Sequence, residues 1–319
     1  MSWACGTGVI QRLGRCADTH CMRISEGFVA IALVVVAAPM WSAALQSLPL
    51  AVGVAHHARS LQPGEVVQVT ATFSRPVSAV RASAFDRVVP FQPTGDRRIW
   101  EGLVGIDLDV EFREHFVTIV GTATDGATVR TQHPLAVVSK EFATRHLTVA
   151  PEYVTPPDDV IERIQREAAR TTKLFNTQTP VAHWRGGFLR PVPGDATSAF
   201  GRRSVFNGQA RSPHSGADFR AGHGTPVKAP NFGTVVLASD LYFSGNCVII
   251  DHGLGLYSFF AHLSRIGVAE GDAVAPGDLI GDVGATGRVT GPHLHWTVRL
   301  NMARVDPLSL MSILTDDGG

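Results

Sequence analysis

The chain has 319 residues, of which 45% are hydrophobic and 18% are charged, and its formal net charge at pH 7 is zero. A chain of this length and composition can bury the cores of two ordinary domains. Phosphate binding needs clustered Lys and Arg, and no basic stripe occurs, so nucleic acid is not expected as a partner.

An apolar run occupies residues 27–41, GFVAIALVVVAAPMW. It is shorter than the ~20 residues that a membrane-spanning helix needs, and it suits the core of a signal peptide with Arg23 as its positive flank. Small residues ending at Ala44 predict cleavage there. Residues 1–44 are therefore expected to be an extension plus signal peptide of an exported protein, and an uncleaved membrane anchor is the alternative.

Three of the four cysteines, Cys5, Cys16 and Cys21, lie ahead of this run, and their spacing fits no zinc template. The fourth, Cys247, lies in an apolar run that predicts a buried strand. No internal disulfide is expected in the exported form.

Residues 45–150 contain short alternating runs separated by turn residues. EVVQVTATF, AVRASAF, RVVPFQ, HFVTIVGTA and PLAVVS predict strands, and PGE, PTGD and TDGA predict turns. No helical period of any length occurs in this region. A small, immunoglobulin-sized β-sandwich is the simplest account.

A linker follows at residues 151–180. After a proline-rich entry, DDVIERIQREAARTTKLF has acidic residues at its start, Lys173 near its end, and Val160, Ile161, Ile164 and Ala168 on one face. These features predict a helix of roughly four turns whose charges suit its dipole.

Residues 181–319 return to short apolar runs and glycine, among them GTVVLAS, NCVIIDHG, LYSFFAHL and HLHWTVRL. This texture predicts an antiparallel β domain with tight turns. The fold class is therefore mainly β: an N-terminal sandwich, a connecting helix, and a C-terminal β domain.

The chemistry-bearing residues gather in two motifs of the C-terminal domain. In SPHSGADF, a strand or loop can aim His214 and Asp218 at one point, with Gly216 letting the backbone bend between them. In GPHLHW, His293 and His295 are two apart in a predicted strand and project to the same face, about 6.6 Å apart. Zinc in hydrolases takes three protein ligands and leaves a fourth position for water, so these motifs predict one zinc ion.

Other histidines have weaker signals. His262 ends an apolar strand, a place where a histidine is usually a satisfied core residue, but its two neighbouring motifs favour a functional role. His252 is expected to be a turn residue with local hydrogen bonds, and His223 a loop residue. Both histidines of the HxH motif could also bind zinc, which would give a closed structural site.

From about residue 187 to residue 307 the sequence resembles the lysostaphin/LytM-type zinc metallopeptidases that cut peptidoglycan. RSPHSGADF resembles the HxxxD motif of that family, LYSFFAHLS the tract with a catalytic histidine, and GATGRVTGPHLHWTV the segment ending in HxH. The motifs occur in the family's order and spacing. The resemblance implies an open antiparallel β-groove of the duplicated hybrid type.

By that resemblance, one Zn²⁺ is bound by His214, Asp218 and His295. His262 and His293 are the catalytic pair that orients or deprotonates the water and stabilises the oxyanion. Some members carry a tyrosine shortly before the first ligand. Here that neighbourhood reads SVFNGQAR, and Asn207 or Arg211 is the candidate substrate contact in its place.

The sequence thus predicts an exported zinc metalloendopeptidase of the periplasm or cell envelope that acts on peptidoglycan peptide stems. Since no SH3-like repeat follows in this sequence, a D-alanyl–diaminopimelate cross-link is favoured over a pentaglycine bridge. One alternative is a non-catalytic cell-wall-binding activator of an amidase, although such relatives have typically lost ligands. A cytoplasmic phosphocarrier is the other, and the export signal argues against it.

The region ahead of the groove suggests regulation. A peptidase that cuts its own cell wall is dangerous if it is always active, so residues 45–180 are hypothesised to lie against the groove and restrict substrate entry. A spacer, or a domain that docks a regulatory envelope partner, is the alternative.

Overall fold

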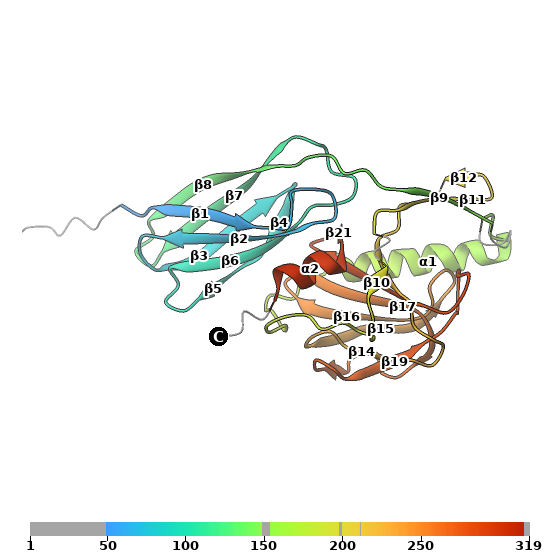
Figure 1. Ribbon diagram of the computed structural model, residues 1–319. Helices are drawn as coiled ribbons and strands as arrows, with labels where there is room; N and C mark the ends of the chain where they lie inside the picture. The colour runs from blue at the N-terminus through green and yellow to red at the C-terminus, as the bar shows by residue number, and fades with distance from the viewer. Residues whose placement is uncertain (1–48, 149–153, 198–199, 211, 316–319) are drawn as a thin grey trace, which may run out of the picture. The chain divides into compact units, whose positions relative to one another are not determined.

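The computed structural model describes residues 49–148, 154–197, 200–210 and 212–315, and its first eight strands form two antiparallel sheets (Figure 1). These strands are β1 (Val52–His57), β2 (Val66–Phe73), β3 (Val77–Ala84), β4 (Arg87–Val89), β5 (Phe91–Thr94), β6 (Ile99–Gly105), β7 (Glu114–Ala123) and β8 (Thr128–Ala136). The sheet orders are β1-β2-β6-β5 and β4-β3-β7-β8. Both sheets contribute to one buried core that includes Val69, Trp100 and Ile119.

The predicted signal peptide, its cleavage site and the first three cysteines lie outside the described residues. Within those residues, no helix is both long and apolar enough to cross a membrane.

The mainly β class is confirmed, but some strand predictions were incomplete. β1 and β6 were missed, and β8 begins at Thr128, six residues before the predicted run PLAVVS. β8 is an edge strand that pairs only with β7 in its sheet, and most of its side chains are exposed or half-buried. A strand with so little buried surface lacks the apolar signal that sequence reasoning depends on.

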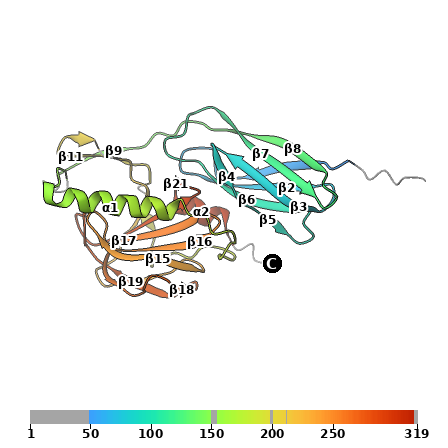
Figure 2. The same ribbon diagram turned by 180° about the vertical axis from the view of Figure 1, so that it is seen from behind.

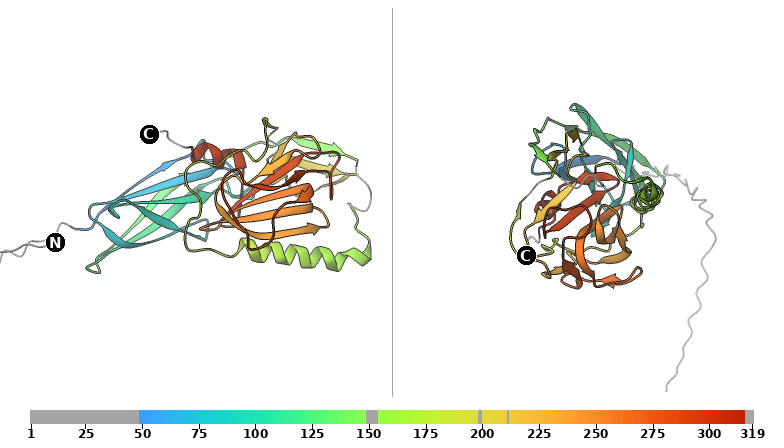
Figure 3. Two further views of the ribbon diagram at one scale, coloured as in Figure 1. Left: turned by 90° about the horizontal axis from the view of Figure 1, so that it is seen from below. Right: turned by 90° about the vertical axis from the view of Figure 1, so that its right-hand side faces the viewer.

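The linker helix α1 (Asp158–Phe175) has the predicted bounds, with Asp158 and Asp159 in its first turn and Lys173 in its last. It lies along the C-terminal sheet, as Figure 2 and the left view of Figure 3 show. The predicted apolar face was partly wrong, because Ile161 and Ala168 are exposed. Apolar packing is concentrated at the C-terminal end of the helix, where Phe175 is buried, and polar contacts hold the rest.

These contacts reach the strand beside the helix, the turn that follows it, and a separate loop at residues 267–272. Arg163 donates to Asp240 at 2.8 Å, and Glu167 accepts a hydrogen bond from the Tyr242 backbone N–H at 2.8 Å. Arg170 pairs with Glu270 at 2.5 Å. With its last turn packed in the core and charged groups bonded along its length, the helix does not need a continuous buried apolar stripe.

The C-terminal region is one antiparallel sheet of ten strands with the main order β10-β13-β20-β17-β16-β15-β18. Its strands are β10 (Ala196–Thr197), β13 (Gly216–Phe219), β14 (Pro226–Lys228), β15 (Gly233–Leu241), β16 (Gly245–Gly253), β17 (Leu256–Ile266), β18 (Ala273–Val274), β19 (Leu279–Val283), β20 (Leu294–Leu300) and β21 (Ala303–Val305). A short C-terminal helix, α2 (Pro307–Ile313), was not predicted. Asp306 caps it by accepting from the Leu308 N–H.

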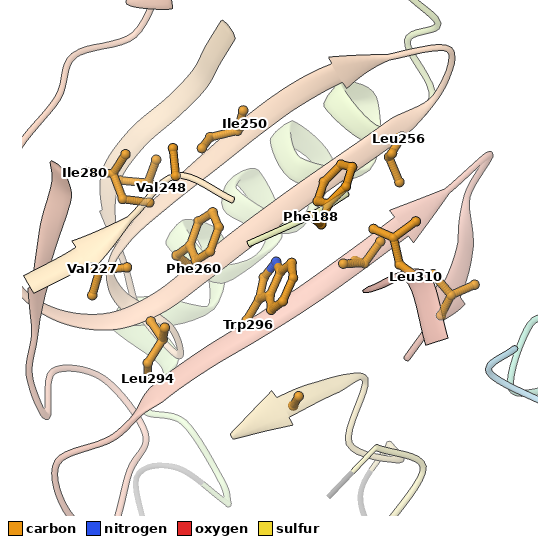
Figure 4. Close-up of a cluster of buried hydrophobic side chains, with 14 of the residues drawn as sticks. Phe188, Val227, Val248, Ile250, Leu256, Phe260, Ile280, Leu294, Trp296 and Leu310 are labelled. Atoms are coloured by element: carbon orange, nitrogen blue, oxygen red, sulfur yellow. The ribbon is translucent and has the colours of Figure 1, made fainter. Parts of the chain in front are cut away.

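The core of this sheet lies directly behind the histidine motifs. Phe260 of β17 and Trp296 of β20 are fully buried and stack with their ring centroids 6.1 Å apart (Figure 4). Leu294 is buried in the same cluster. Since side chains alternate between the two faces of a strand, the intervening His295 must point to the opposite face.

A third small sheet joins the end of the N-terminal region to the segment before His214. β9 (Thr144–Leu147) pairs in parallel with β11 (Arg203–Phe206), which forms a hairpin with β12 (Gln209–Ala210), and Figure 1 shows these strands together. The Arg203 N–H also donates to the Ala143 carbonyl at 3.0 Å. Chain segments on both sides of the predicted linker therefore contact each other, and the predicted domain boundaries at residues 150 and 180 stay predictions.

Candidate metal centre

Asp218 and His295 are held together by the pairing of β13 with β20. They are direct partners in the antiparallel register, and their side chains meet with 3.0 Å between Oδ1 and Nδ1. Gly216 lies two residues earlier in the same regular pairing, opposite Thr297, so the predicted bend at this glycine was wrong. A Cβ at Gly216 would lie 2.5 Å from the Trp296 carbonyl oxygen, so the glycine is needed for close approach of the strands.

His214 lies just before β13 and is fixed through its backbone. Its N–H donates to the Arg202 carbonyl at 2.9 Å, and its carbonyl accepts from the Gly201 N–H at 2.7 Å. A Cβ at Gly201 would lie 2.0 Å from the Phe142 ring, so the Phe142 side chain packs directly on this glycine. The segment around Gly201 is therefore bonded to the backbone of His214 and also packed against Phe142, a residue just before β9.

Three ligand-type atoms converge at this point. His214 Nε2 lies 2.9 Å from His295 Nδ1, and each of these nitrogens lies 3.0 Å from Asp218 Oδ1. Ligand atoms around one tetrahedral zinc, with bonds of about 2.0–2.1 Å, lie roughly 3.3 Å from one another. The triangle therefore has nearly the size that one zinc ion requires.

Protons cannot satisfy all three contacts. If both imidazoles donated to Asp218, two N–H groups would face each other between His214 and His295. If only one donated, the other nitrogen would still face the carboxylate oxygen with its lone pair, and if neither donated, both nitrogens would do so. A single cation satisfies all three atoms, so the donor set fits a zinc ion.

His262 reaches the same point through an irregularity in β17. Its neighbour Ala261 is directly opposite His295, so in a regular strand His262 would point away from that residue. The register between β16 and β17 shifts here, and His262 has a φ of 65°, a left-handed backbone that non-glycine residues rarely adopt. This β-bulge turns the side chain so that its ring centroid lies 5.9 Å from that of His295 and 5.0 Å from that of His293.

The tautomers of His262 and His293 follow from backbone contacts. A carbonyl oxygen can only accept, so the Nδ1–H of His262 donates to the Thr286 carbonyl and that of His293 to the Gly291 carbonyl, both at 2.9 Å. In both residues Nε2 is then the nitrogen left for chemistry. Nε2 of His293 lies 3.8 Å from Asp218 Oδ1, outside the triangle of close contacts.

Burial controls the charge of the site. Desolvation by itself raises the pKa of the Asp218 carboxyl, but the close contacts of its Oδ1 with the imidazoles of His214 and His295 outweigh it and hold that pKa far below its ordinary value. Burial and the neighbouring His295 lower the pKa of His262 to about 3. Burial also lowers the pKa of His295, against the opposing effect of Asp218. The two imidazoles are therefore neutral near pH 7, while Asp218 is ionised.

The five predicted metal and catalytic residues are thus brought together, whereas the predicted substrate contacts are not placed by the same geometry. Asn207 is exposed at the tip of the β11–β12 hairpin, and its φ of 50° followed by 83° at Gly208 is the conformation for which Asn-Gly turns are selected. Its role in substrate binding stays a prediction. Arg211 lies outside the described residues.

His252 is not the turn residue that was predicted. It lies in β16 with no exposed surface, where Nδ1–H donates to the Phe232 carbonyl at 2.7 Å and Nε2 contacts the Ser258 hydroxyl at 2.9 Å. Both ring nitrogens are occupied, so His252 is a satisfied core histidine. His223 is an exposed loop residue, as predicted.

Sequence reasoning missed Thr286, which positions His262. Besides accepting from His262, it donates its hydroxyl to the Leu263 carbonyl at 2.8 Å and accepts from the Asn246 N–H at 3.0 Å. The signal was present in the glycine-rich loop GATGRVTG, where a threonine in a tight turn can use both its side chain and its carbonyl.

The segment that contains this centre is similar to a known family of peptidases. The model of peptidase family M23 matches residues 212–307, which include all five site residues. The solved structure of a Pseudomonas aeruginosa protein assigned to peptidase M23 is 33% identical, with a TM-score of 0.63, and the match covers 80% of this chain and 96% of that one.

Curated relatives match over the same region. The DD-carboxypeptidase/endopeptidase Mpg of Neisseria meningitidis is 44% identical over 97 residues, which is 30% of this chain and 22% of the relative. The peptidoglycan DD-endopeptidase ShyA of Vibrio cholerae is 46% identical over 85 residues, which is 27% of this chain and 20% of the relative. The match thus spans about a fifth of the length of these curated relatives.

Proposed function

The chain belongs to peptidase family M23, and on that premise we propose that it is a zinc metalloendopeptidase that hydrolyses peptide cross-links of bacterial peptidoglycan. The observation that carries the proposal is the convergence of His214, Asp218 and His295, with His262 and His293 beside them, inside the family segment. The names of the Mpg and ShyA relatives, both of which include endopeptidase, support the activity class.

In this proposal His214 Nε2, Asp218 Oδ1 and His295 Nδ1 hold the zinc ion. Zinc with three protein ligands lowers the pKa of a water molecule to about 7 and polarises a carbonyl group. The ionised Asp218 offsets part of the cation's charge, and each of the two imidazoles offers a nitrogen lone pair.

His262 and His293 share the remaining chemistry. Each has its Nδ1–H fixed on a backbone carbonyl, so each offers Nε2 toward the centre. A neutral Nε2 can accept a proton from the attacking water and pass it to the leaving amine. A protonated Nε2 donates a hydrogen bond to the oxyanion that forms on the scissile carbonyl. The pair divides these two tasks between them.

The substrate that we propose is the D-alanyl–diaminopimelate cross-link between peptide stems. The DD-endopeptidase name of ShyA supports this choice over a pentaglycine bridge. Peptidoglycan lies outside the cytoplasm, so this substrate also requires export, in agreement with the signal peptide predicted at residues 27–44.

The test is digestion of purified cross-linked muropeptides by residues 45–319, with the products identified by mass. We expect the cross-linked dimer to yield two monomeric stems, activity to disappear after zinc is removed with a chelator, and activity to return with zinc. An intact dimer in the presence of zinc, together with increased activity of an added amidase, would instead identify the chain as a non-catalytic amidase activator.

The N-terminal region is where we propose that regulation acts. β9 of this region pairs with β11, and Gly201, two residues before β11, donates its N–H to the His214 carbonyl. A movement of the N-terminal region can therefore shift the position of His214, a proposed metal ligand. Residues 181–319 alone should act faster than residues 45–319 on the same peptidoglycan, with the same zinc content, if the region restricts entry. Equal rates from two folded proteins would show that the region does not restrict entry and only links the peptidase domain to the rest of the chain. A slower fragment with less zinc would show that the region stabilises the zinc site.

A further inference from the structure

Thr297 contacts the one nitrogen of His295 that does not face the metal centre. Its Oγ1 lies 2.9 Å from His295 Nε2, and the side chain is 2% exposed. The two residues are two apart in β20, so their side chains lie on the same face of the strand. His295 is therefore held between Asp218 at Nδ1 and Thr297 at Nε2.

The position of a single proton decides what His295 can do. A neutral imidazole carries one N–H, and the other nitrogen has the lone pair that a metal needs. If the proton is on Nε2, the lone pair on Nδ1 points at His214 and Asp218. If the proton is on Nδ1, that nitrogen can only donate a hydrogen bond to Asp218 and cannot bind zinc.

In the other histidines of the centre, a hydrogen bond at one ring nitrogen decides which nitrogen faces the centre. His262 and His293 are fixed by Nδ1–H bonds to carbonyl oxygens and so present Nε2, whereas His295 has its outer contact at Nε2 and presents Nδ1. Among the described residues, the Nδ1 of His214 is buried without a hydrogen-bond partner. His295 is thus the ligand whose tautomer a neighbouring side chain can select.

The strand opposite leaves room for this contact. Gly216 is the register partner of Thr297, and a Cβ at Gly216 would lie 2.8 Å from Thr297 Oγ1 and 2.8 Å from His295 Cε1. Any larger residue would push the threonine or the imidazole aside. The glycine of the HSGAD motif and the threonine of HLHWT therefore act on the same ring.

We propose that Thr297 is a positioning residue that accepts the Nε2–H of His295 and thereby keeps Nδ1 available as the zinc ligand. Loss of such an outer contact typically costs about 10- to 100-fold in metal affinity. The inference rests on the proposed function, since it assigns Thr297 a part in the same metal centre.

The experiment compares three variants of residues 45–319. Thr297→Val keeps the shape of the side chain but leaves the buried Nε2–H without an acceptor, whereas Thr297→Ser keeps the hydroxyl. Thr234→Val makes the same chemical change in β15, on a threonine outside the centre. Zinc affinity is measured by competition with a chromogenic chelator, and the tautomer of zinc-loaded His295 by ¹⁵N NMR of the imidazole.

We expect Thr297→Val to bind zinc about 10- to 100-fold more weakly, and Thr297→Ser and Thr234→Val to bind it within a few-fold of the parent. The parent should show its His295 proton on Nε2. A parent-like affinity in a folded Thr297→Val protein, or a His295 proton on Nδ1 in the zinc-loaded parent, would overturn the assignment. A parent that binds zinc but cleaves no muropeptide would contradict the proposed function and leave the role of Thr297 intact.

Discussion

Asp218 and His295 are direct cross-strand partners in β13 and β20, and the 3.0 Å contact between Oδ1 and Nδ1 is a consequence of that register. A shift of one residue in the pairing would turn one of the two side chains to the other face of the sheet. The candidate metal centre therefore depends on the buried side chains that hold the register, among them Trp296 and Phe219.

Removal of the carboxylate tests the ligand set. Asp218→Ala should lose stoichiometric zinc and activity together, because it removes the only anionic atom of the converging triangle. Zinc is measured by elemental analysis after dialysis, and His214→Ala and His295→Ala should behave in the same way. Asp96→Ala, which changes an exposed carboxylate in the turn between β5 and β6, is the control and should retain both. Full zinc and activity in any ligand variant would remove that residue from the set.

Zinc content and turnover, measured on variants of the other two histidines, should distinguish metal ligands from catalytic groups. His262→Ala and His293→Ala should retain zinc and lose about 10²–10⁴-fold in turnover, the range that acid/base groups contribute. Zinc content and muropeptide turnover are measured on the same preparations. Zinc loss in His293→Ala would mean that both histidines of the HxH motif bind the metal.

The support of His214 can be tested at Gly201. Gly201→Ala places a Cβ against the Phe142 ring at a φ of +74°, so it should lower both the free energy of unfolding and the zinc affinity. Gly126→Ala is the matched control, since Gly126 has a φ of +85° but open space around its Cβ position. The backbone strain of roughly 1–2 kcal/mol is common to both variants. Equal zinc affinity in the two would show that the Phe142 contact does not reach His214.

Acid sensitivity of the fold should come in part from His252. Burial lowers its pKa from 6.5 to about 4 in the folded chain, so between these values the unfolded chain binds a proton that the folded chain does not. Stability is therefore full above about pH 6.5 and falls as the pH decreases toward 4, by at most about 3 kcal/mol. Urea denaturation at pH 7 and pH 5 should show this loss, and His252→Gln should be less stable at pH 7 but less dependent on pH. An unchanged pH dependence in that variant would rule out His252 as its source.

Local patterns predicted a large part of this protein. The bounds of α1 followed from acidic residues at one end and a lysine at the other, and most strands from alternation and turn residues. The five residues of the candidate centre could be proposed from the sequence because HxxxD, HxH and the histidine after an apolar run occur together, in an order that resembles a known peptidase family. β1, β6 and α2 were missed, and the start of β8 was misplaced because an edge strand with little buried surface has no apolar signal.

The orientation of the site side chains depends on pairing between strands that are distant in the sequence. The sequence by itself determined that His262 follows an apolar run, and a regular strand would have turned it away from His295. Only the β-bulge in β17, with its left-handed backbone held by the Ser244 carbonyl, brings the ring to the centre. The contact of Thr297 with His295 and the need for glycine at position 216 likewise depend on which strand lies opposite. The periodicity of a segment indicates its extent and which of its faces is buried. The pairing of distant strands is instead set by the packing of the whole core. The site residues could therefore be predicted from the sequence, but the orientation of their side chains could not.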